Sequence, residues 1–404
     1  MKGEMHMKVL VLGGTGIQGS AVAQDMVRKG GVTDVVIAAR RKEALQHTAS
    51  WLKSEKLKTE CVDVSDKDRL VKLMKEGEFD VVVSSVPWRV AITPLEASVE
   101  AGVDFLDFGL YQNLAFDENI SKFDEKAKKA GITVVPSCGV APGLTNMLAG
   151  YGASKLDEVE KIHIFVGGIP ERPQPPLGYR TVWSLEGVWT EYVGKCRIIR
   201  DRKMEEVDAA SGLESLDFPP LGKLQAIYTD GIGTLLHSYR EPFLKGVQEV
   251  YEKTLRWPGH IEKIYALREC GLLDTEPIKV DEVEISPRKF LTTLLNPKLK
   301  LGENERDITA LRVDVIGKKE GSDAKYVSHM IDYRDMKTGV ISMARTTGYT
   351  GSIVAQMMCQ GKIKEKGVVM PEKLGADEAL FGEMLGEYSK RNITIVGGFS
   401  TTAT

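Results

Sequence analysis

The sequence predicts an α/β fold in which an N-terminal domain with a doubly wound parallel sheet precedes an interwoven α+β domain. Three observations support this prediction. The chain has 404 residues, more than one hydrophobic core normally organises. Short apolar runs alternate with amphipathic helical segments as far as residue 150, and a glycine-rich turn joins the first run to the first helix.

The first domain follows a regular strand–helix order. The expected strands are apolar runs at residues 8–12, 34–38, 59–62, 80–83, 103–107 and 133–136. Segments of helical period lie between them, at 18–29, 42–53, 67–75, 94–101 and 122–130. Because a helix follows each strand, the strands are expected to be parallel, with right-handed crossovers and a crevice at their carboxyl ends.

The pattern changes after the loop at 138–143. A helix is expected at 144–154, a strand at 161–166 and a proline- and glycine-rich loop at 167–178. Further strands are expected at 197–200, 310–316 and 326–332, and an apolar, small-residue helix at 342–361. We therefore expect a Rossmann domain at 1–145, an α+β substrate and dimerisation domain at 146–340, and a C-terminal helical segment at 341–404 that packs back on the first domain.

Composition excludes several function classes. The formal net charge of −3 does not favour nucleic acid or an anionic membrane as partner, and no apolar run reaches the length of a membrane span. The first strand begins almost at once, so no signal peptide is expected. Five scattered cysteines without a paired spacing indicate neither a disulfide framework nor a metal site, and predict a cytoplasmic protein.

The turn after the first strand carries the pattern G-x-G-x-x-G at Gly14, Gly16 and Gly19. Between a strand and a helix, this pattern is typical of a dinucleotide-binding loop, because the glycines permit a tight turn and a close approach of the backbone to a pyrophosphate. The helix N-terminus then offers N–H groups to the phosphates. The expected cofactor contacts in this loop are Gly14, Thr15, Gly16, Ile17 and Gln18. The alternative is a structural turn that binds nothing.

The end of the second strand decides between NAD and NADP. An acidic residue there would bind the ribose 2′-hydroxyl of NAD. Ala39 is followed instead by Arg40 and Arg41, whose guanidinium groups can bind a 2′-phosphate, so NADP is favoured and NAD stays an alternative. The two arginines could also simply solvate the start of a helix.

Two further strand ends are expected to complete the cofactor site. Asp63 and Val64, after the third strand, would flank the adenine. The segment after the fourth strand would line the nicotinamide ribose with its backbone, through Ser84, Ser85, Val86 and Pro87.

Several uncommon strings beyond this domain resemble the saccharopine dehydrogenase-like family. They are CGVAPGLTN at 138–146, VGGIP at 166–170, PPLGY at 175–179, WSLEG at 183–187, TLRWPGH at 254–260 and MARTTGY at 343–349. With the Rossmann half, the resemblance runs from residue 7 to about 370. It implies an NAD(P)-dependent oxidoreductase that acts on the C–N bond of an amino-acid amine and binds a small-molecule substrate. Self-association, most simply as a homodimer, is also expected.

Two positions distinguish branches of that family. Saccharopine reductases carry an aspartate where Ala141 stands and an arginine where Glu186 stands, whereas the lysine 6-dehydrogenase branch is similar to this chain at both. The resemblance therefore implies L-lysine 6-dehydrogenase, which gives the 6-semialdehyde, although that branch usually has an acid where Ala39 stands. The alternatives are an NADP-dependent, glutamate-forming saccharopine dehydrogenase and a non-catalytic nucleotide-sensing protein.

Five side chains are candidates for binding and proton transfer in that reaction. Arg180 would clamp a carboxylate, and Glu186 would hold an ammonium group or act as base. Tyr179 would donate a hydrogen bond, Asp230 would face the cleft, and His260 would transfer a proton. Each also has a structural alternative: a surface arginine, a helix N-terminal acid, a packed tyrosine, a turn residue and a buried histidine.

Overall fold

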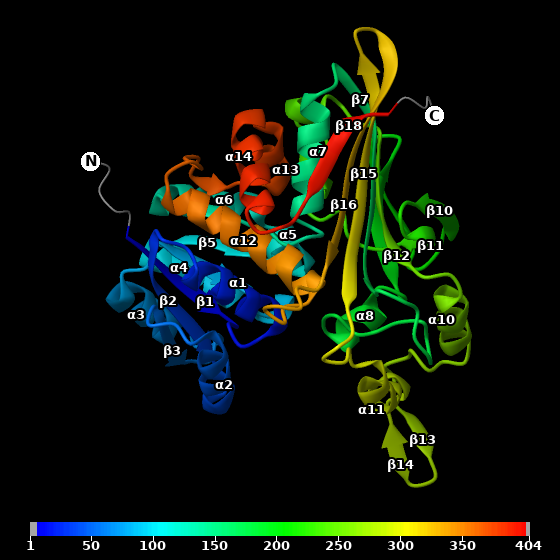
Figure 1. The fold of residues 1–404 in the computed structure, drawn as a ribbon, viewed down its shortest axis with the longest axis horizontal. Helices are drawn as coiled ribbons and strands as arrows, with labels where there is room; N and C mark the ends of the chain where they lie inside the picture. Colours follow the sequence, from blue (N-terminus) through cyan, green and yellow to red (C-terminus); the bar gives the residue numbers. More distant parts are fainter. Residues whose placement is uncertain (1–5, 401–404) are drawn as a thin grey trace. The chain divides into compact units, whose positions relative to one another are not determined.

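A computed structural model describes residues 6–400 of the chain (Figure 1). The contacts divide the protein into two compact units, each of which is assembled from separate stretches of sequence. The first unit holds the chain up to Ser154, Gly233–Ser238 and Ala344–Ile393. The second unit holds Lys155–Ile232, Tyr239–Met343 and the chain from Thr394 onward.

The first unit is built on a seven-stranded sheet in the order β17-β6-β5-β4-β1-β2-β3. Every pairing along it is parallel. Its strands are β1 Met7–Leu12, β2 Val32–Ala39, β3 Leu57–Cys61, β4 Val81–Ser84, β5 Asp104–Asp107, β6 Thr133–Val135 and β17 Gly367–Val368. Because β1 pairs with both β2 and β4, the strand order reverses there, at the point where such folds bind ligands. The α/β class with an N-terminal Rossmann domain is confirmed.

Helices connect these strands and fill the rest of the unit. They are α1 Ile17–Val27, α2 Lys42–Leu52, α3 Lys67–Gly77, α4 Ile92–Ala101, α5 Leu114–Asp117, α6 Ile120–Ala130, α7 Leu144–Ser154, α9 Leu235–Ser238, α12 Ser342–Cys359, α13 Pro371–Ala376 and α14 Glu378–Ser389. Short 3₁₀ turns lie at Trp88–Val90 and Leu110–Gln112. The apolar faces of the sheet and helices enclose a core that includes Leu10, Val82 and Phe105, each fully buried.

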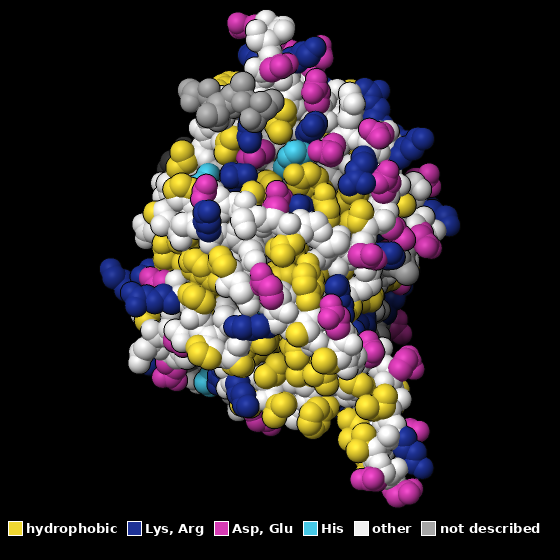
Figure 2. Space-filling view, turned by 90° about the vertical axis from the view of Figure 1, so that its right-hand side faces the viewer, with side chains coloured by type: hydrophobic (Ala, Val, Ile, Leu, Met, Phe, Trp, Pro, Cys, Tyr) yellow, Lys and Arg dark blue, Asp and Glu magenta, His cyan; other side chains and the backbone are white. Residues whose placement is uncertain are grey.

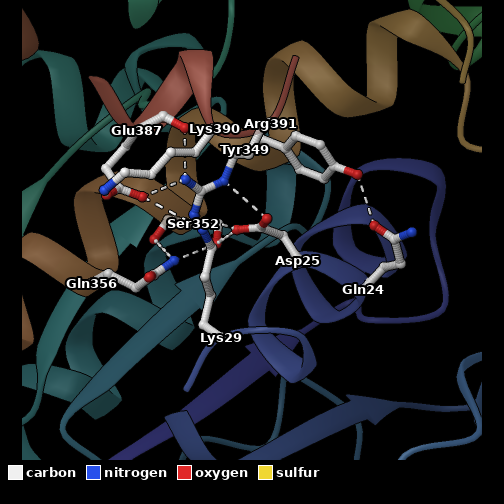
Figure 3. Close-up of polar contacts among 9 residues, drawn as sticks. All are labelled: Gln24, Asp25, Lys29, Tyr349, Ser352, Gln356, Glu387, Lys390 and Arg391. Atoms are coloured by element: carbon white, nitrogen blue, oxygen red, sulfur yellow. Dashed lines mark hydrogen bonds and ion pairs between the residues drawn. The ribbon is translucent and has the colours of Figure 1, made fainter. Parts of the chain in front are cut away.

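A buried ion pair ties the C-terminal helices to the start of the chain within this unit (Figure 3). The guanidinium of Arg391 makes two hydrogen bonds to the carboxylate of Asp25 on α1, at 2.8 and 2.9 Å. Ser352 of α12 donates to the same carboxylate at 2.5 Å, and Glu387 of α14 accepts from Arg391 at 2.7 Å. Arg391 and Asp25 are 7% and 5% exposed, so the pair is nearly removed from water.

The second unit is a nine-stranded, mostly antiparallel sheet with the path β10-β11-β12-β7-β15-β16-β18, from which β8 and β9 branch at β12. Its strands are β7 Glu158–Pro170, β8 Lys195–Arg200, β9 Lys203–Asp208, β10 Glu214–Phe218, β11 Gly222–Tyr228, β12 Glu249–Arg256, β15 Asp307–Lys319, β16 Ser322–Tyr333 and β18 Ile395–Phe399. A separate two-stranded sheet pairs β13 Ile278–Val280 with β14 Val283–Ile285. The helices are α8 Leu185–Thr190, α10 His260–Glu269 and α11 Pro287–Leu299, with a 3₁₀ turn at Pro242–Leu244.

The structure differs from the sequence expectation at three places. The helix α7 clusters with the first unit, whereas the sequence predicts residues 146–340 as the second domain. Strand β7 runs to Pro170, so the expected loop at 167–178 begins later, because Gly167–Pro170 pairs with β15. The C-terminal segment is not wholly helical: β17 extends the first sheet, and β18 pairs with β16 in the second. These pairings join residues far apart in sequence, which local patterns do not reveal.

Candidate functional site

The glycine turn follows β1 and ends at the first residue of α1. Gly13 has φ +73°, and a Cβ on it would lie 2.3 Å from the carbonyl oxygen of Ser85. A Cβ on Gly14 would lie 2.6 Å from the Cβ of Ile37, and one on Gly19 would lie 2.4 Å from the carbonyl oxygen of Gly13. Backbone atoms and the β-branched side chain of Ile37 thus leave no room for a side chain at these three positions. The turn needs glycine for its own shape, as a close-fitting phosphate loop does.

The N-terminus of α1 is open to an anion. Gly16 is its N-cap, no side chain caps the helix, and no acidic residue lies in its first turn. Such a helix start presents N–H groups and a partial positive charge. Thr15 and Gln18 are partly buried beside it, and Ile17 is 44% exposed. The glycine cradle and the uncapped helix together fit the pyrophosphate of a dinucleotide.

The end of β2 carries the two arginines expected to select NADP. Arg40 and Arg41 are exposed, and within residues 6–400 neither guanidinium makes an ion pair. Asp63 lies just past the end of the neighbouring strand β3, whose last residue, Cys61, pairs with Ala39 of β2. Hydrogen bonds from the backbone and hydroxyl of Ser65 hold the pKa of Asp63 below its ordinary value. The arginines are therefore available to a phosphate, and Asp63 with Val64 borders the same edge.

The end of β4 lies on the other side of the turn, since Leu12 of β1 pairs with Ser84. Ser84 is 1% exposed, and its hydroxyl has no hydrogen-bond partner in the described part of the chain. Ser85 and Val86 are partly buried and Pro87 is exposed. The predicted cofactor residues thus gather at the carboxyl edge of the sheet, where the strand order reverses. A separate cavity of about 660 Å³, lined by Lys29, Gln356 and Glu387, shares no residue with this edge.

A buried polar cluster lies in the second unit, and we call Tyr179, Glu191, Tyr192, Arg256 and His260 the Arg256 cluster. The Nε of Arg256 donates to the Tyr192 hydroxyl at 2.8 Å, and its Nη2 pairs with the carboxylate of Glu191. Its guanidinium also lies 5.1 Å from the centre of the Tyr179 ring, within cation–π range. Every member except Glu191 is at most 2% exposed.

His260 is fixed by hydrogen bonds on both ring nitrogens. Its Nδ1 lies 2.9 Å from the carbonyl oxygen of Leu177, which can only accept, so this nitrogen carries the proton. Its Nε2 lies 2.9 Å from the Tyr192 hydroxyl and accepts from it. Burial, aided by the charge of Arg256, lowers the pKa of His260 to about 3, and burial raises that of Tyr192 to about 12. His260 is neutral at physiological pH, with no free nitrogen in this arrangement.

Tyr179 packs against this pair, with its ring centre 5.4 Å from that of His260. It is 1% exposed, and its hydroxyl lacks a hydrogen-bond partner among residues 6–400. Burial raises its pKa well above the ordinary range, so the hydroxyl keeps its proton. Of the five candidate side chains, the structure brings together only Tyr179 and His260.

The other three candidates lie in separate ion pairs. Arg180 binds the carboxylate of Glu305 through its Nε at 3.1 Å and through its Nη2 at 3.3 Å. Asp230 binds the guanidinium of Arg197 in the same two-point manner, at 3.0 and 3.2 Å.

Glu186 differs from these pairs. Its side chain is 51% exposed in the first turn of α8, and it approaches Arg288 only at 3.9 Å. Its carboxylate is thus the most available of the candidate charges.

Sequence reasoning missed Glu191, Tyr192, Arg256 and Glu252. Arg256 stood within a string that carried the family resemblance, but Glu191 and Tyr192 have no local signal, because their partners lie some 65 residues away. Glu252 of β12 is 2% exposed and accepts from the hydroxyls of Thr229 and Thr254. Burial raises its pKa to about 8, so it is protonated at neutral pH.

Among residues 6–400, no helix has both the length and the apolar character needed to cross a bilayer. The same residues contain no group of three or more histidine, cysteine, aspartate or glutamate side chains placed to hold a metal ion.

Several known proteins align with this chain over nearly its whole length. A carboxyaminopropylagmatine dehydrogenase from Synechocystis is 25% identical, over 93% of this chain and 96% of its own. A carboxynorspermidine synthase from Vibrio cholerae is 26% identical, over 93% and 94% of the two chains. The glutamate-forming, NADP-dependent saccharopine dehydrogenase of Saccharomyces cerevisiae is 24% identical, over 95% and 98%.

A solved structure of the yeast enzyme shares the fold, with a TM-score of 0.79, 22% identity, and coverage of 98% of this chain and 100% of that one. The family model of the saccharopine dehydrogenase NADP-binding domain matches residues 9–135, and that of the C-terminal domain matches residues 139–393. The chain therefore belongs to the saccharopine dehydrogenase family, as an oxidoreductase with an N-terminal NADP-binding domain.

Proposed function

We propose that this protein is an NADP-linked oxidoreductase that makes or breaks the C–N bond of a secondary amine joining an amino-acid fragment to a basic amine. One observation carries this choice among the activities of the family. The half-exposed carboxylate of Glu186 stands where saccharopine reductases carry an arginine, and its contact with Arg288 is long. A carboxylate at that place repels a second substrate carboxylate and attracts an ammonium group.

The relatives support the same substrate class. Carboxyaminopropylagmatine and carboxynorspermidine are, by their names, basic amines that carry a carboxylated arm. Both enzymes match this chain over more than nine-tenths of their own length. The relatives named here do not include a lysine 6-dehydrogenase, so the comparisons give that branch no support.

The chemistry requires few groups from the protein. When bound, NADP would supply the hydride acceptor, so that a hydride leaves the carbon that bears the nitrogen and the nitrogen loses a proton. Water then adds to the resulting imine and releases an aldehyde and a primary amine; the reverse sequence builds the secondary amine. Arg40 and Arg41 would hold the 2′-phosphate, and the glycine turn with the start of α1 would hold the pyrophosphate.

The remaining candidates take supporting roles in this proposal. His260, neutral and bonded at both nitrogens, positions Tyr192 and packs against Tyr179 rather than acting as a base. Arg180 would receive a substrate carboxylate only in exchange for Glu305, and Asp230 fixes Arg197. The Tyr179 hydroxyl is the member of the cluster with unused hydrogen-bonding capacity.

L-Lysine 6-dehydrogenase is the second candidate. Ala141 and Glu186 favour it, since both match that branch, and lysine also presents an amine to Glu186. It differs from the first proposal in a way that can be measured: lysine alone would be oxidised, without any carboxylated arm on its side-chain nitrogen.

The purified protein should be assayed with NADP and, in turn, carboxynorspermidine, saccharopine and L-lysine. We expect the highest kcat/KM with carboxynorspermidine. Glu186→Arg should lower that value about tenfold or more, because an ammonium then meets a like charge. The matched control Glu206→Arg, at an exposed position on β9, should leave it unchanged. Preference for lysine would select the second candidate, and preference for saccharopine would contradict the role of Glu186.

A further inference from the structure

The second unit carries a projecting arm formed by the hairpin β13–β14 and the helix α11, which follows it directly (Figures 1 and 2). In the hairpin, Ile278 pairs with Ile285 and Val280 with Val283, while Lys279 pairs with Glu284. Since side chains alternate between the faces of a strand, one face of the hairpin is wholly apolar. This hairpin pairs with neither of the two large sheets.

The apolar face is left open to water. Ile278, Val280 and Val283 are 54%, 46% and 59% exposed. An isolated two-stranded hairpin is marginal in water and normally packs an apolar face against another element. Figure 2 shows hydrophobic side chains along the arm, at the lower right, and charged ones at its tip.

The helix of the arm continues the apolar surface. Leu291, Leu295 and Leu299 are buried in the core of the unit. The neighbouring stripe, spaced four residues apart, holds Phe290 and Leu294, which are 53% and 47% exposed. Intramolecular packing therefore accounts for one stripe of α11 and leaves the next one open.

Charge along the arm is separated by sign. The hairpin and the loop before it carry Glu276, Asp281, Glu282 and Glu284 against the single lysine Lys279, which reaches Glu282 at 3.7 Å. The helix and its end carry exposed Lys289, Lys298 and Lys300. Within residues 6–400, these three lysines and the acids Glu276, Asp281 and Glu284 make no ion pair. The arm is thus acidic at its tip, apolar along its length and basic at its helix.

We propose that this arm is a dimerisation surface whose occupant is the arm of a second copy of the same chain. A two-fold pairing in opposite directions sets the acidic hairpin of each copy against the basic helix of the other, and the apolar surfaces cover one another. In a two-fold interface one patch must complement itself. The separated charges meet this condition, whereas a uniformly charged arm would repel its copy.

A charge-exchange experiment tests the proposal on the full-length protein, with molar mass followed against concentration by light scattering or sedimentation. One variant is Asp281→Lys with Glu284→Lys, and the other is Lys289→Glu with Lys298→Glu. We expect the wild type to be dimeric and each variant alone to dissociate at least about tenfold more readily, because like charges then face one another. Mixing the two variants should restore the dimer, since each hairpin again meets a helix of opposite charge.

The controls separate this surface from others. Lys126→Glu with Lys223→Glu changes the net charge by the same amount as the helix variant, at exposed sites off the arm, and should leave the dimer intact. Val280→Ser with Val283→Ser should weaken it by about tenfold or more through lost apolar contact. Circular dichroism should show every variant folded. A monomeric wild type, a dimer insensitive to both charge variants, or a mixture that fails to restore association would each overturn the proposal.

Discussion

The glycine turn of the first unit and the Arg256 cluster of the second are both polar, but they differ in where their hydrogen-bonding capacity is used. The turn leaves the start of α1 uncapped and allows no side chain to fill the space at Gly13, Gly14 and Gly19. In the cluster, the Arg256 guanidinium and both His260 nitrogens already have protein partners. The first region is shaped to receive a ligand, whereas the second holds its own geometry.

This difference indicates which side chains can recognise a substrate. A buried charge that is already paired offers little to a ligand, because binding would first break the existing pair. Under the proposed function, we therefore expect recognition in the second unit to use groups with spare capacity, such as the half-exposed Glu186 and the unpartnered hydroxyl of Tyr179.

The largest expected effect is on the stability of the Arg256 cluster. Arg256→Met should lower the free energy of unfolding by about 3–5 kcal/mol, because it leaves the Glu191 carboxylate buried without a cation. Urea denaturation would measure this loss. Adding Glu191→Gln should recover part of it, since no buried charge then remains. Lys195→Met, in a solvent-exposed pair with Asp208, is the control and should cause no measurable change.

The next effect is on the glycine turn. Gly14→Val should weaken NADP binding on the order of 100-fold, because its Cβ would enter the space of Ile37 and shift the turn. Titration of the fluorescence of the reduced cofactor would measure it. Gly30→Val is the matched control, since nothing lies within 4 Å of a Cβ there. Equal binding by both variants would mean that the turn does not form the phosphate site.

A smaller effect separates the two arginines. Replacing whichever of Arg40 and Arg41 holds the 2′-phosphate by serine should weaken NADP binding by about tenfold and leave NAD binding unchanged. Arg69→Ser, at an exposed position on α3, is the control. If both cofactors lost affinity equally, the arginine would contact a part that they share.

At a mildly acidic pH of about 6, the smallest effect is a pH dependence in the Arg256 cluster, and this effect grows as the pH falls further. The folded protein holds the pKa of His260 at about 3, below the ordinary value of 6.5, so between these values the unfolded chain binds more protons. His260 thus destabilises the fold increasingly as pH falls through this window, by about 1.4 kcal/mol per pH unit. His260→Gln removes that titration. The stability of this variant relative to the wild type should therefore rise as the pH falls below 6.5. A difference in unfolding free energy that stays constant with pH would contradict the buried, neutral state of His260.

The fold of the NADP-binding half was largely predictable from local sequence. The spacing of Gly14, Gly16 and Gly19 predicts the turn, because this glycine pattern between a strand and a helix is typical of a dinucleotide-binding loop. The expected strand ends at Arg40, Asp63 and Ser84 could be placed on one edge because parallel strands share their direction.

The substrate half was not predictable in the same way. Arg180 is predicted to clamp a substrate carboxylate and Asp230 to face the cleft, yet in the structure they are bound by Glu305 and Arg197, which lie 125 and 33 residues away along the chain. Strand β18 joins the second sheet from the far end of the chain, which no periodic pattern indicates.

The sequence alone thus determined the fold class, the family and the glycine turn, because these depend on the periods of strands and helices, on uncommon local strings and on glycine spacing. Only the tertiary structure decided which charges are already neutralised, that His260 is held neutral, and that Ile278, Val280 and Val283 are left exposed on the arm. Ion pairing and burial depend on residues brought together from distant parts of the chain, so they exist only once the chain has folded.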